Sequence, residues 1–286
     1  MDRRPLLRDL IKEKQADLTA AERRLTATLL DDSLVSGLQS ITKLAEDTGV
    51  SAPTIIRLAR KLGFDGYPDL QNAIRDEVAA RMKQPLAKLD AWQGDSDHIV
   101  SRFATAVSQN INRTLDRLDL DEFDRVAGLL SDPKRNIFLL GGRISRSNAH
   151  YFFNHLQIIR PNVSLLDSSP SVWPQSLLAM DARAVLVVFD IRRYEKELER
   201  LAKLATEQGV SIVLITDQWG SPIEKHAAHC FRCLVEAPSS WDSTLVINFL
   251  IEALIADIQS RSATSSAERI AAMEKMIGQT RIFRSS

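Results

Sequence analysis

The sequence lacks a long apolar run, a signal-like start and a net charge. No run of about 18 apolar residues occurs, which excludes a hydrophobic helix that spans a bilayer. The first five residues, Met-Asp-Arg-Arg-Pro, are charged, so we expect the protein to stay in the cytosol and to bind no membrane. The 37 basic and 37 acidic residues balance, and this argues neither for nor against nucleic acid as a partner.

Cysteine is scarce, and its two occurrences, Cys230 and Cys233, form a C-x-x-C pattern. His226 and His229 lie just upstream, which superficially provides four metal ligands. Residues 229–235 are predicted to form a strand, where side chains alternate, so the two thiols should point to opposite faces. We therefore expect a buried structural pair instead of a zinc site or a redox motif, and we predict no metal and no cofactor.

Length and composition indicate two globular domains. A chain of 286 residues exceeds what one hydrophobic core usually serves. Hydrophobic residues make up 44% and charged residues 26%, which is close to the average of soluble globular proteins.

The stretch 40–64 is predicted to form two short helices joined by a tight turn. Ser40 precedes apolar residues at helical spacing, as an N-cap residue does, and Gly49 can adopt the left-handed conformation that ends the first helix. Ser51 is the corresponding N-cap of the second helix, which tolerates Pro53 in its first turn. The residues predicted to face inward are Ile55, Leu58, Ala59 and Leu62. This pattern predicts a helix-turn-helix.

The outward face of the second helix is predicted to be basic. No acidic residue occurs from Thr48 to Phe64, and hydroxyl and guanidinium groups suit a recognition helix in a DNA major groove. An ordinary solvated face is the alternative, but the preceding helix, the glycine turn and the caps favour DNA. The residues predicted to contact a double-stranded DNA operator are Ser40, Ser51, Pro53, Thr54, Arg57, Arg60 and Lys61.

The segment 50–64 reads V-S-A-P-T-I-I-R-L-A-R-K-L-G-F. It resembles the recognition segment of RpiR-type transcriptional regulators, V-S-x-A-T-V-x-R-F-x-R-K-L-G-F. Pro53 in place of alanine and Leu58 in place of phenylalanine keep the helix start and the core position. The resemblance implies an N-terminal DNA-binding domain followed by a sugar-isomerase-type (SIS) ligand domain.

The remaining chain is predicted to add helices and then a parallel sheet. Thr19 and Glu22 form a capping box that opens a helix before the helix-turn-helix. Short apolar runs at 136–140, 163–166, 184–189, 210–215 and 230–235 alternate with helical patterns, which predicts a doubly wound α/β domain with five parallel strands. We assign residues 1–83 to an all-α helix-turn-helix domain, 84–96 to a linker, 97–262 to the SIS-like ligand-binding and dimerisation domain, and 263–286 to a C-terminal helix and tail.

Two loops are predicted to form a ligand site, because ligands bind beyond the carboxyl ends of parallel strands where the strand order reverses. The first loop carries glycines that let backbone amides approach a ligand, and the second carries two arginines. The predicted ligand-binding residues are Gly141, Gly142, Arg143, Ser145, Asp190, Arg192, Arg193, Tyr194 and Thr216. The alternative is that Arg192 and Arg193 pair with Asp190, Glu195 or Glu197, or with the partner subunit.

Residues 97–260 resemble the SIS fold, with one departure in the ligand loops. Gly141, Ser145 and Ala149 fit the family's G-x-G-x-S loop and the alanine that follows it, while Arg143 replaces the middle glycine. The family's phosphate-gripping S-x-S-G-x-T is replaced by Asp190-Ile-Arg-Arg-Tyr-Glu195. The replacement departs from the usual phosphosugar site and still provides groups for an anion.

The leading interpretation is a transcription factor that responds to a small anionic metabolite and forms a homodimer or a higher homo-oligomer without catalytic residues. The alternative is an SIS-family phosphosugar isomerase or a related enzyme, which needs a general base. The candidates Glu195, His150 and His155 have no evident partner in the sequence that would orient them. A nucleotide-binding module is weaker, because no G-x-G-x-x-G is present.

Overall fold

The computed structural model describes residues 5–31, 35–82 and 98–280. The chain divides into two compact units, Met1–Ala87 and Lys88–Ser286. The predicted linker 84–96 and the last residues, 281–286, lie outside the described residues. No helix in the described ranges is both long and apolar enough to cross a membrane.

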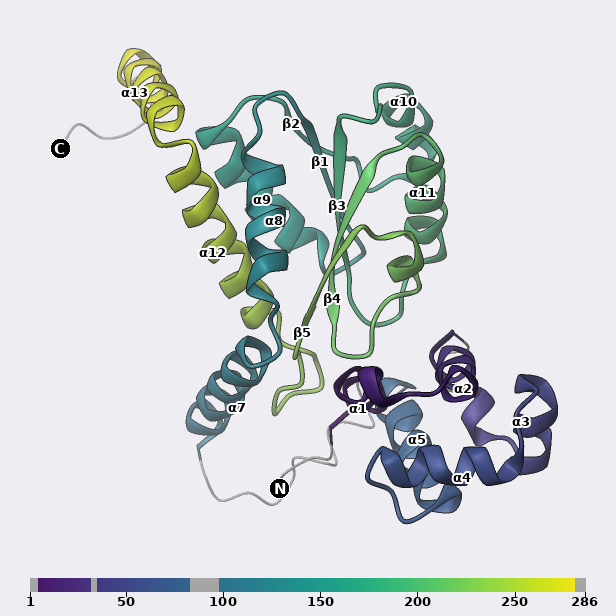
Figure 1. The fold of residues 1–286 in the computed structure, drawn as a ribbon. Coiled ribbons are helices and arrows are strands. Elements are labelled where there is room, and N and C mark those ends of the chain that lie inside the picture. The colour runs from purple at the N-terminus through teal and green to yellow at the C-terminus, as the bar shows by residue number, and fades with distance from the viewer. Residues whose placement is uncertain (1–4, 32–34, 83–97, 281–286) are drawn as a thin grey trace. The chain divides into compact units, whose positions relative to one another are not determined.

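The first unit is helical, as predicted (Figure 1). Its helices are α1 (Leu7–Glu13), α2 (Ala20–Asp31), α3 (Ile41–Thr48), α4 (Ala52–Lys61) and α5 (Tyr67–Met82). The capping box of α2 is confirmed: the Thr19 amide donates to Glu22 Oε2 at 2.8 Å, and the Glu22 amide donates to Thr19 Oγ1 at 3.3 Å. Its core includes the fully buried side chains of Leu25, Leu29, Leu44, Ile55, Leu58, Leu70 and Ile74.

The second unit is a doubly wound α/β domain, and this prediction is confirmed. Its parallel strands lie in the order β2-β1-β3-β4-β5, so the order reverses between β1 and β3. The strands are β1 (Asn136–Gly141), β2 (Val163–Leu165), β3 (Ala184–Asp190), β4 (Ser211–Asp217) and β5 (His229–Cys233). The helices are α7 (Ile99–Leu115), α8 (Leu120–Ser131), α9 (Arg146–Ile159), α10 (Trp173–Leu178), α11 (Lys196–Glu207), α12 (Leu245–Arg261) and α13 (Ala263–Thr280).

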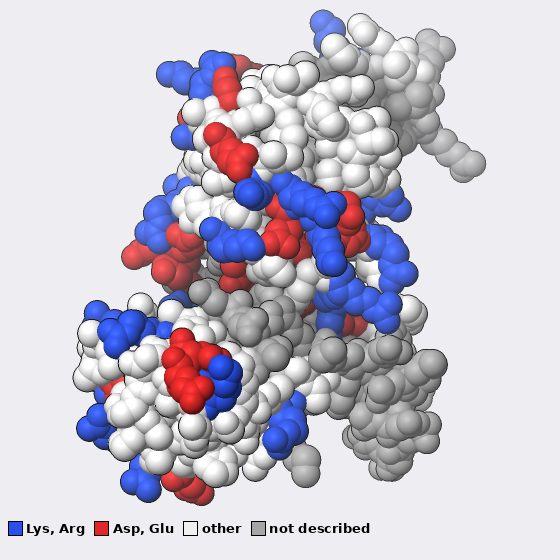
Figure 2. Space-filling model, turned by 90° about the vertical axis from the view of Figure 1, so that its right-hand side faces the viewer, with Lys and Arg blue, Asp and Glu red and all other residues white. Residues whose placement is uncertain are grey.

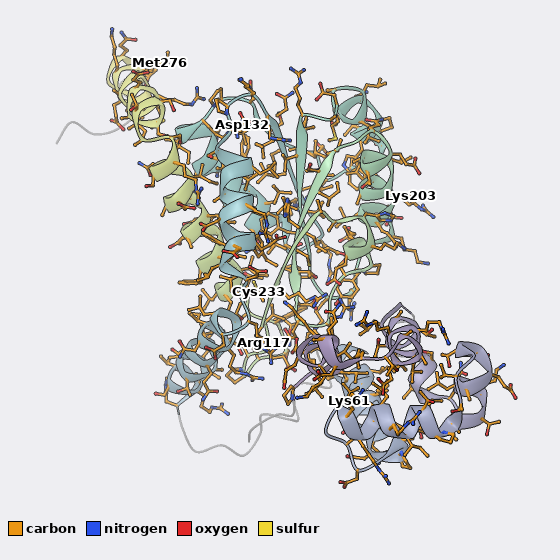
Figure 3. The ribbon with its side chains drawn as sticks, viewed as in Figure 1. Lys61, Arg117, Asp132, Lys203, Cys233 and Met276 are labelled. Atoms are coloured by element: carbon orange, nitrogen blue, oxygen red, sulfur yellow. The ribbon has the colours of Figure 1, made fainter. Side chains whose placement is uncertain are left out.

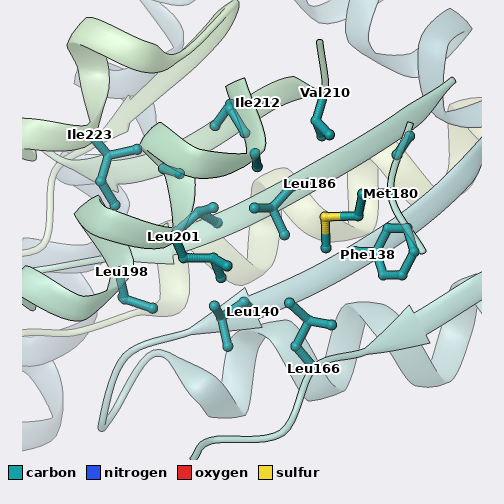
Figure 4. Close-up of a cluster of buried hydrophobic side chains, with 14 of the residues drawn as sticks. Phe138, Leu140, Leu166, Met180, Leu186, Leu198, Leu201, Val210, Ile212 and Ile223 are labelled. Atoms are coloured by element: carbon teal, nitrogen blue, oxygen red, sulfur yellow. The ribbon is translucent and has the colours of Figure 1, made fainter. Parts of the chain in front are cut away.

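Helices cover both faces of the sheet, with α10 and α11 on one side and α8, α9 and α12 on the other (Figure 1). All seven residues of β3 are buried, as expected for a central strand with two covered faces. On the α11 side, Leu186 and Ile212 of the sheet pack with Leu198 and Leu201 of α11 (Figure 4). The α11 surface itself carries basic and acidic side chains next to one another, and Figure 2 views the molecule from this side.

Each strand differs from its predicted run by one or two residues at one or both ends. The last strand was expected to reach Val235 and ends at Cys233, because the next two amides donate to side chains: Leu234 N to Thr114 Oγ1 and Val235 N to Gln218 Oε1. The C-terminal helix that was expected within 263–286 is α13, which runs from Ala263 to Thr280. Cys233 is buried, and burial raises the pKa of its thiol to about 12.

Candidate functional site

The helix-turn-helix forms as its caps predict. Ser40 Oγ accepts a hydrogen bond from the Lys43 amide at 3.2 Å, which satisfies one free donor at the start of α3. Gly49 has a φ of +64°, a left-handed conformation that glycine adopts without strain, and it ends α3. After α4, the Phe64 amide donates back to the Ala59 carbonyl at 3.0 Å, and the ring is buried.

The start of α4 differs from the prediction in what its hydroxyl groups do. Ser51 occupies the N-cap position, but its side chain bonds no helix amide, and its Oγ lies 2.9 Å from Thr54 Oγ1. Thr54 was expected on the outward face, and this is wrong: only 8% of it is exposed. The reason is helical spacing, since Thr54 lies one turn before the fully buried Leu58. Thr54 Oγ1 also accepts from Arg57 Nη2 at 3.2 Å.

Lys61 was also expected on the outward basic face, and the structure pairs it inside its own unit. Its Nζ donates to Glu22 Oε2 at 2.7 Å and to the Asp17 carbonyl at 3.0 Å. Glu22 is buried; burial alone raises the pKa of its carboxyl, but the bonds from Lys61 and Thr19 outweigh it and hold the pKa below the usual value. Lys61 therefore joins α4 to α2.

The basic groups that remain on the exposed face of α4 are Arg57 and Arg60. They share this face with Pro53, at spacings of four and then three residues, so all three project from one side of the helix. Arg57 is oriented by its bond to Thr54, and Arg60 Nε donates weakly to the Asp65 carbonyl at 3.5 Å. The position of Lys61, at the end of the helix, is labelled in Figure 3.

The Gly-Gly loop after β1 is fixed by Ser145. Its Oγ accepts from the Gly142 amide at 3.0 Å and donates to the Phe189 carbonyl at 2.7 Å, which ties the loop to the end of β3. A Cβ atom at Gly141 would lie 2.6 Å from the Ser145 carbonyl oxygen, so only glycine fits there. Gly141 and Ser145 are both buried, and they shape the loop without presenting a free group.

A carboxylate of the chain itself occupies this loop. Glu195 Oε1 accepts from the Arg143 amide at 2.6 Å, and a Cβ atom at Gly142 would lie 2.9 Å from the same oxygen. The loop before α9 therefore holds an anion that belongs to the protein. The sequence suggested Glu195 only as a base or as a partner of arginine, because this contact joins residues 52 positions apart.

The second predicted loop is a strained turn held by a residue that the sequence analysis missed. Arg192 and Arg193 have φ values of +44° and +41°, a conformation that costs energy in residues other than glycine. The buried Asp217 accepts from the Arg192 amide at 2.7 Å, the Tyr194 hydroxyl at 2.8 Å and the Trp219 amide at 3.0 Å. Burial raises the pKa of Asp217, and these bonds oppose the rise. Asp217 is the last residue of β4, and this position at the carboxyl end of a predicted strand could have marked it as a site residue.

The two arginines of this turn have different surroundings. Arg192 Nε donates to Asp242 Oδ2 at 2.8 Å, and its guanidinium lies 3.7 Å from the centre of the Trp219 ring. Arg192 therefore has a structural partner within the chain, and this partner, Asp242, was not among the acidic residues proposed from the sequence. Arg193 is exposed, and within the described ranges its side chain makes no hydrogen bond or ion pair.

Asp190 and Thr216 were predicted to contact the ligand, and both are buried. Asp190 Oδ2 accepts from the Ser221 hydroxyl at 2.5 Å and Oδ1 from the Glu195 amide at 3.4 Å, while Thr216 Oγ1 donates to the Asp190 carbonyl at 2.6 Å. Burial raises the pKa of Asp190 to about 7. In this conformation their oxygen atoms position the strand ends and are not presented to a ligand.

The histidines considered as bases lie on α9. His155 Nδ1 is 2.9 Å from the Tyr151 carbonyl, and His150 stacks on Phe153 with 6.4 Å between ring centres. Neither imidazole has a carboxylate partner among the residues that the structure describes. A carboxylate–histidine pair is therefore not formed by either candidate in the described part of the chain, and the His155 ring is held by a backbone carbonyl instead.

Each of the two units matches a known protein domain. Residues 6–81 match the profile of the helix-turn-helix domain of the rpiR family, and residues 129–256 match that of the SIS domain. The regulator HexR of Pseudomonas aeruginosa is 28% identical over 232 residues, covering 78% of this chain and 77% of HexR. The regulator RpiR of Escherichia coli K12 is 26% identical over 221 residues, covering 76% of this chain and 72% of RpiR.

Solved structures share the fold. The sugar isomerase domain of an RpiR transcription factor from Sphaerobacter thermophilus aligns with a TM-score of 0.59 at 16% identity, covering 63% of this chain and 99% of that one. Vibrio vulnificus NanR in complex with ManNAc-6P aligns with a TM-score of 0.54 at 16% identity, covering 96% of this chain and 98% of that one. With an rpiR-type helix-turn-helix at its N-terminus and an SIS domain after it, the chain belongs to the RpiR family of transcriptional regulators.

Proposed function

We propose that the protein binds a double-stranded DNA operator through the exposed face of α4, and that its SIS domain adjusts this binding in response to a small anionic metabolite. The protein would act in the cytoplasm as a homodimer or higher homo-oligomer, so that two copies of α4 meet a two-fold operator. The observation that carries the proposal is the exposed pair Arg57 and Arg60 on a capped helix, with Arg57 oriented by Thr54 before DNA arrives.

The effector class follows from the groups that remain available at the switch point of the sheet. Arg143 and Arg193 are exposed there, and the Gly-Gly loop already holds a carboxylate in the form of Glu195. Guanidinium groups and backbone amides favour a phosphate or a carboxylate. The complex of V. vulnificus NanR with ManNAc-6P supports the same class, and we infer a sugar phosphate, a sugar acid or a similar anion.

Operator binding tests the first half of the proposal. The purified protein is used to select fragments from a genomic library, and fluorescence anisotropy then gives the affinity for the selected site. We expect Arg57→Ala and Arg60→Ala each to weaken specific binding by roughly 1 to 3 kcal/mol. Arg75→Ala, which removes an exposed arginine of α5, is the matched control and should bind as the wild type does. Wild-type affinity in both α4 variants contradicts the assignment of the DNA face.

A thermal-shift screen of sugar phosphates, sugar acids, amino sugars and keto acids tests the second half. A true ligand stabilises the folded protein by mass action, in proportion to the logarithm of its concentration. A hit is then added to the protein–DNA complex, because an effector changes operator affinity only if it binds the free and the DNA-bound protein with different affinity. A hit that stabilises the SIS domain and leaves operator affinity unchanged would refute the sensing role.

One observation favours the enzyme alternative: the carboxyl of Asp190 has a pKa of about 7, the range that suits a general base. However, Asp190 is 2% exposed, and its oxygens already accept from Ser221 and Glu195. A substrate proton cannot reach it without opening the loop. Incubating each screen hit with the protein and analysing it by mass spectrometry and NMR decides the matter, since turnover restores the enzyme function.

A further inference from the structure

Helix α12 exposes large apolar side chains that no other described element covers. The helix, with the sequence LVINFLIEALIADIQSR, has apolar residues on every side, a composition typical of a fully buried helix. Yet Leu245 is 48% exposed and Phe249 is 39% exposed, and they lie one helical turn apart on the same side. Farther along the same side, beyond the exposed Glu252, Ala256 is exposed as well.

This side of α12 leads into a groove at the junction of α12 and α13. The two helices are separated by Ser262, whose hydroxyl donates to the Ile258 carbonyl at 2.7 Å, a contact typical of a bend. Apart from Gln259 of α12, the groove is lined by small or apolar side chains: Ala256 and Ser260 of α12 and Ala263, Ala267, Ile270 and Ala271 of α13. The alanines of α13 recur every four residues, so they share one face of that helix.

Helix α13 is attached to the domain by a small part of its surface. Ser266 Oγ donates to the Ile159 carbonyl at 3.1 Å, and Arg269 donates from Nε and Nη2 to the Gln157 carbonyl at 3.0 and 2.8 Å. Ser266 is the buried residue of this 18-residue helix, and Met276 near its end is 65% exposed (Figure 3). A helix of this length is only marginally stable without a packed face, so a further contact is expected.

The sequence of α13 indicates which partner fits. Residues 267–276 read A-E-R-I-A-A-M-E-K-M, and the pattern is complementary to itself when read in the opposite direction. About the midpoint between Ala271 and Ala272, Glu268 corresponds to Lys275, Arg269 to Glu274 and Ile270 to Met273. Two antiparallel copies of α13 therefore place opposite charges together and apolar residues together, with Ala271 of the groove face beside the two-fold axis.

We propose that α13 pairs in antiparallel fashion with α13 of a second copy of this chain, each helix seated in the groove that the other copy forms with its α12. Two-fold symmetry makes every contact occur twice. Glu268 and Lys275 are seven residues apart, so they lie on the same flank of the helix, where an antiparallel partner brings Glu268 of one copy to Lys275 of the other. Arg269, which the Gln157 carbonyl already holds, contributes less.

This surface gives the homo-oligomer of the proposed function a specific interface, and its tests do not depend on DNA or effector binding. The first test is a charge exchange in the full-length protein, read by sedimentation equilibrium. Glu268→Lys and Lys275→Glu each place like charges together twice per pair, and we expect each to raise the dissociation constant about ten-fold or more. The double variant Glu268→Lys with Lys275→Glu restores opposite charges and should recover the wild-type constant.

Within one helix the two residues lie about two turns apart, so recovery must come from a second helix. Arg200→Glu on α11 changes the charge by the same amount on the other side of the sheet and should leave the constant unchanged. Circular dichroism confirms that each variant keeps its helices. Wild-type constants in both single variants, a double variant as weak as the singles, or a wild-type protein that remains monomeric overturns the proposal.

The second test is a cross-link at the two-fold axis, made with Cys230 replaced by Ser. Ala271→Cys lies on the groove face beside the midpoint and should form an intermolecular disulfide under mild oxidation. Ala272→Cys is the matched control, because the next residue of a helix points about 100° away and faces solvent. Equal cross-linking of the two variants, or cross-linking of Ala272→Cys alone, shows that another face of α13 pairs and contradicts the proposed geometry.

Discussion

Lys61→Met isolates the contact between α4 and α2. Methionine keeps most of the volume of the lysine chain and removes the ammonium group, so Glu22 stays buried with its carboxylate lacking a cation. A hydrogen bond to a charged group contributes roughly 1.5 to 3 kcal/mol. Because the Lys61 side chain is 31% exposed, water replaces part of the loss, and we expect a cost of about 2 kcal/mol.

Hydrogen exchange of the α4 amides, followed by mass spectrometry, measures this cost in the intact protein. A loss of about 2 kcal/mol corresponds to roughly 30-fold faster exchange through opening of the helical unit. Lys43→Met is the control, because Lys43 makes an exposed pair with Asp47 within α3 at 2.9 Å and should change exchange little. Adding Glu22→Gln to Lys61→Met removes the uncompensated charge and should recover part of the protection.

The pH dependence adds an independent check. Glu22 has a pKa below its ordinary value of 4.5, so Lys61 stabilises the ionised form of the folded protein. This contribution is fully present above pH 4.5 and is lost as the pH falls through the folded pKa. The difference between the wild type and Lys61→Met should shrink in acid. Unchanged protection in Lys61→Met, together with weaker DNA binding and a salt dependence flatter by about one unit of slope, would refute the reasoning and make Lys61 a phosphate contact.

Three further predictions concern the two units. Arg192→Ala should lower the free energy of unfolding by about 2 kcal/mol, because it removes the hydrogen bond to Asp242 and the contact with Trp219. Arg193→Ala should leave the free energy of unfolding unchanged and weaken the binding of a screen hit. Urea unfolding that gives the two variants the same stability contradicts this prediction. The raised pKa of Asp190 makes the wild type lose stability as the pH rises from 3.8 to about 7. Asp190→Asn lacks this ionisation, so its stability relative to the wild type should increase between pH 5 and pH 8, by at most roughly 4 kcal/mol. Gly49→Ala should cost about 1 kcal/mol, since its φ of +64° strains any side chain although space is free around it, and a melting temperature equal to the wild type's argues against that strain.

The sequence predicted the features that depend on local pattern. The caps at Ser40 and Gly49 and the apolar spacing of α4 were recovered because they involve residues within a few positions of one another. The five strands were recovered because buried parallel strands are continuous apolar runs. The order β2-β1-β3 then predicted that the Gly-Gly loop and the turn after β3 meet at the carboxyl ends of the strands, and hydrogen bonds join them there.

The contacts that the sequence could not predict join residues far apart in the chain. Lys61 was assigned to DNA because Glu22, its partner 39 residues upstream, gives no local signal. Arg192 was left between ligand and structure because Asp242 lies 50 residues downstream. Thr54 is a local error: a hydroxyl at the edge of a helix face can turn inward when Ser51 and Arg57 bond to it.

In the proposed ligand site, the Glu195 carboxylate on the Arg143 amide sets a threshold that an incoming anion must exceed. An anion reaches this amide only by exchanging with Glu195, so a weak and abundant ion such as inorganic phosphate must compete with a group whose local concentration is fixed by the chain. A metabolite that also engages Arg143 and Arg193 has additional contacts with which to displace the carboxylate. If the proposed site binds its ligand here, this internal anion makes the site discriminate by the number of contacts that a ligand makes, and weak background ions are excluded from it.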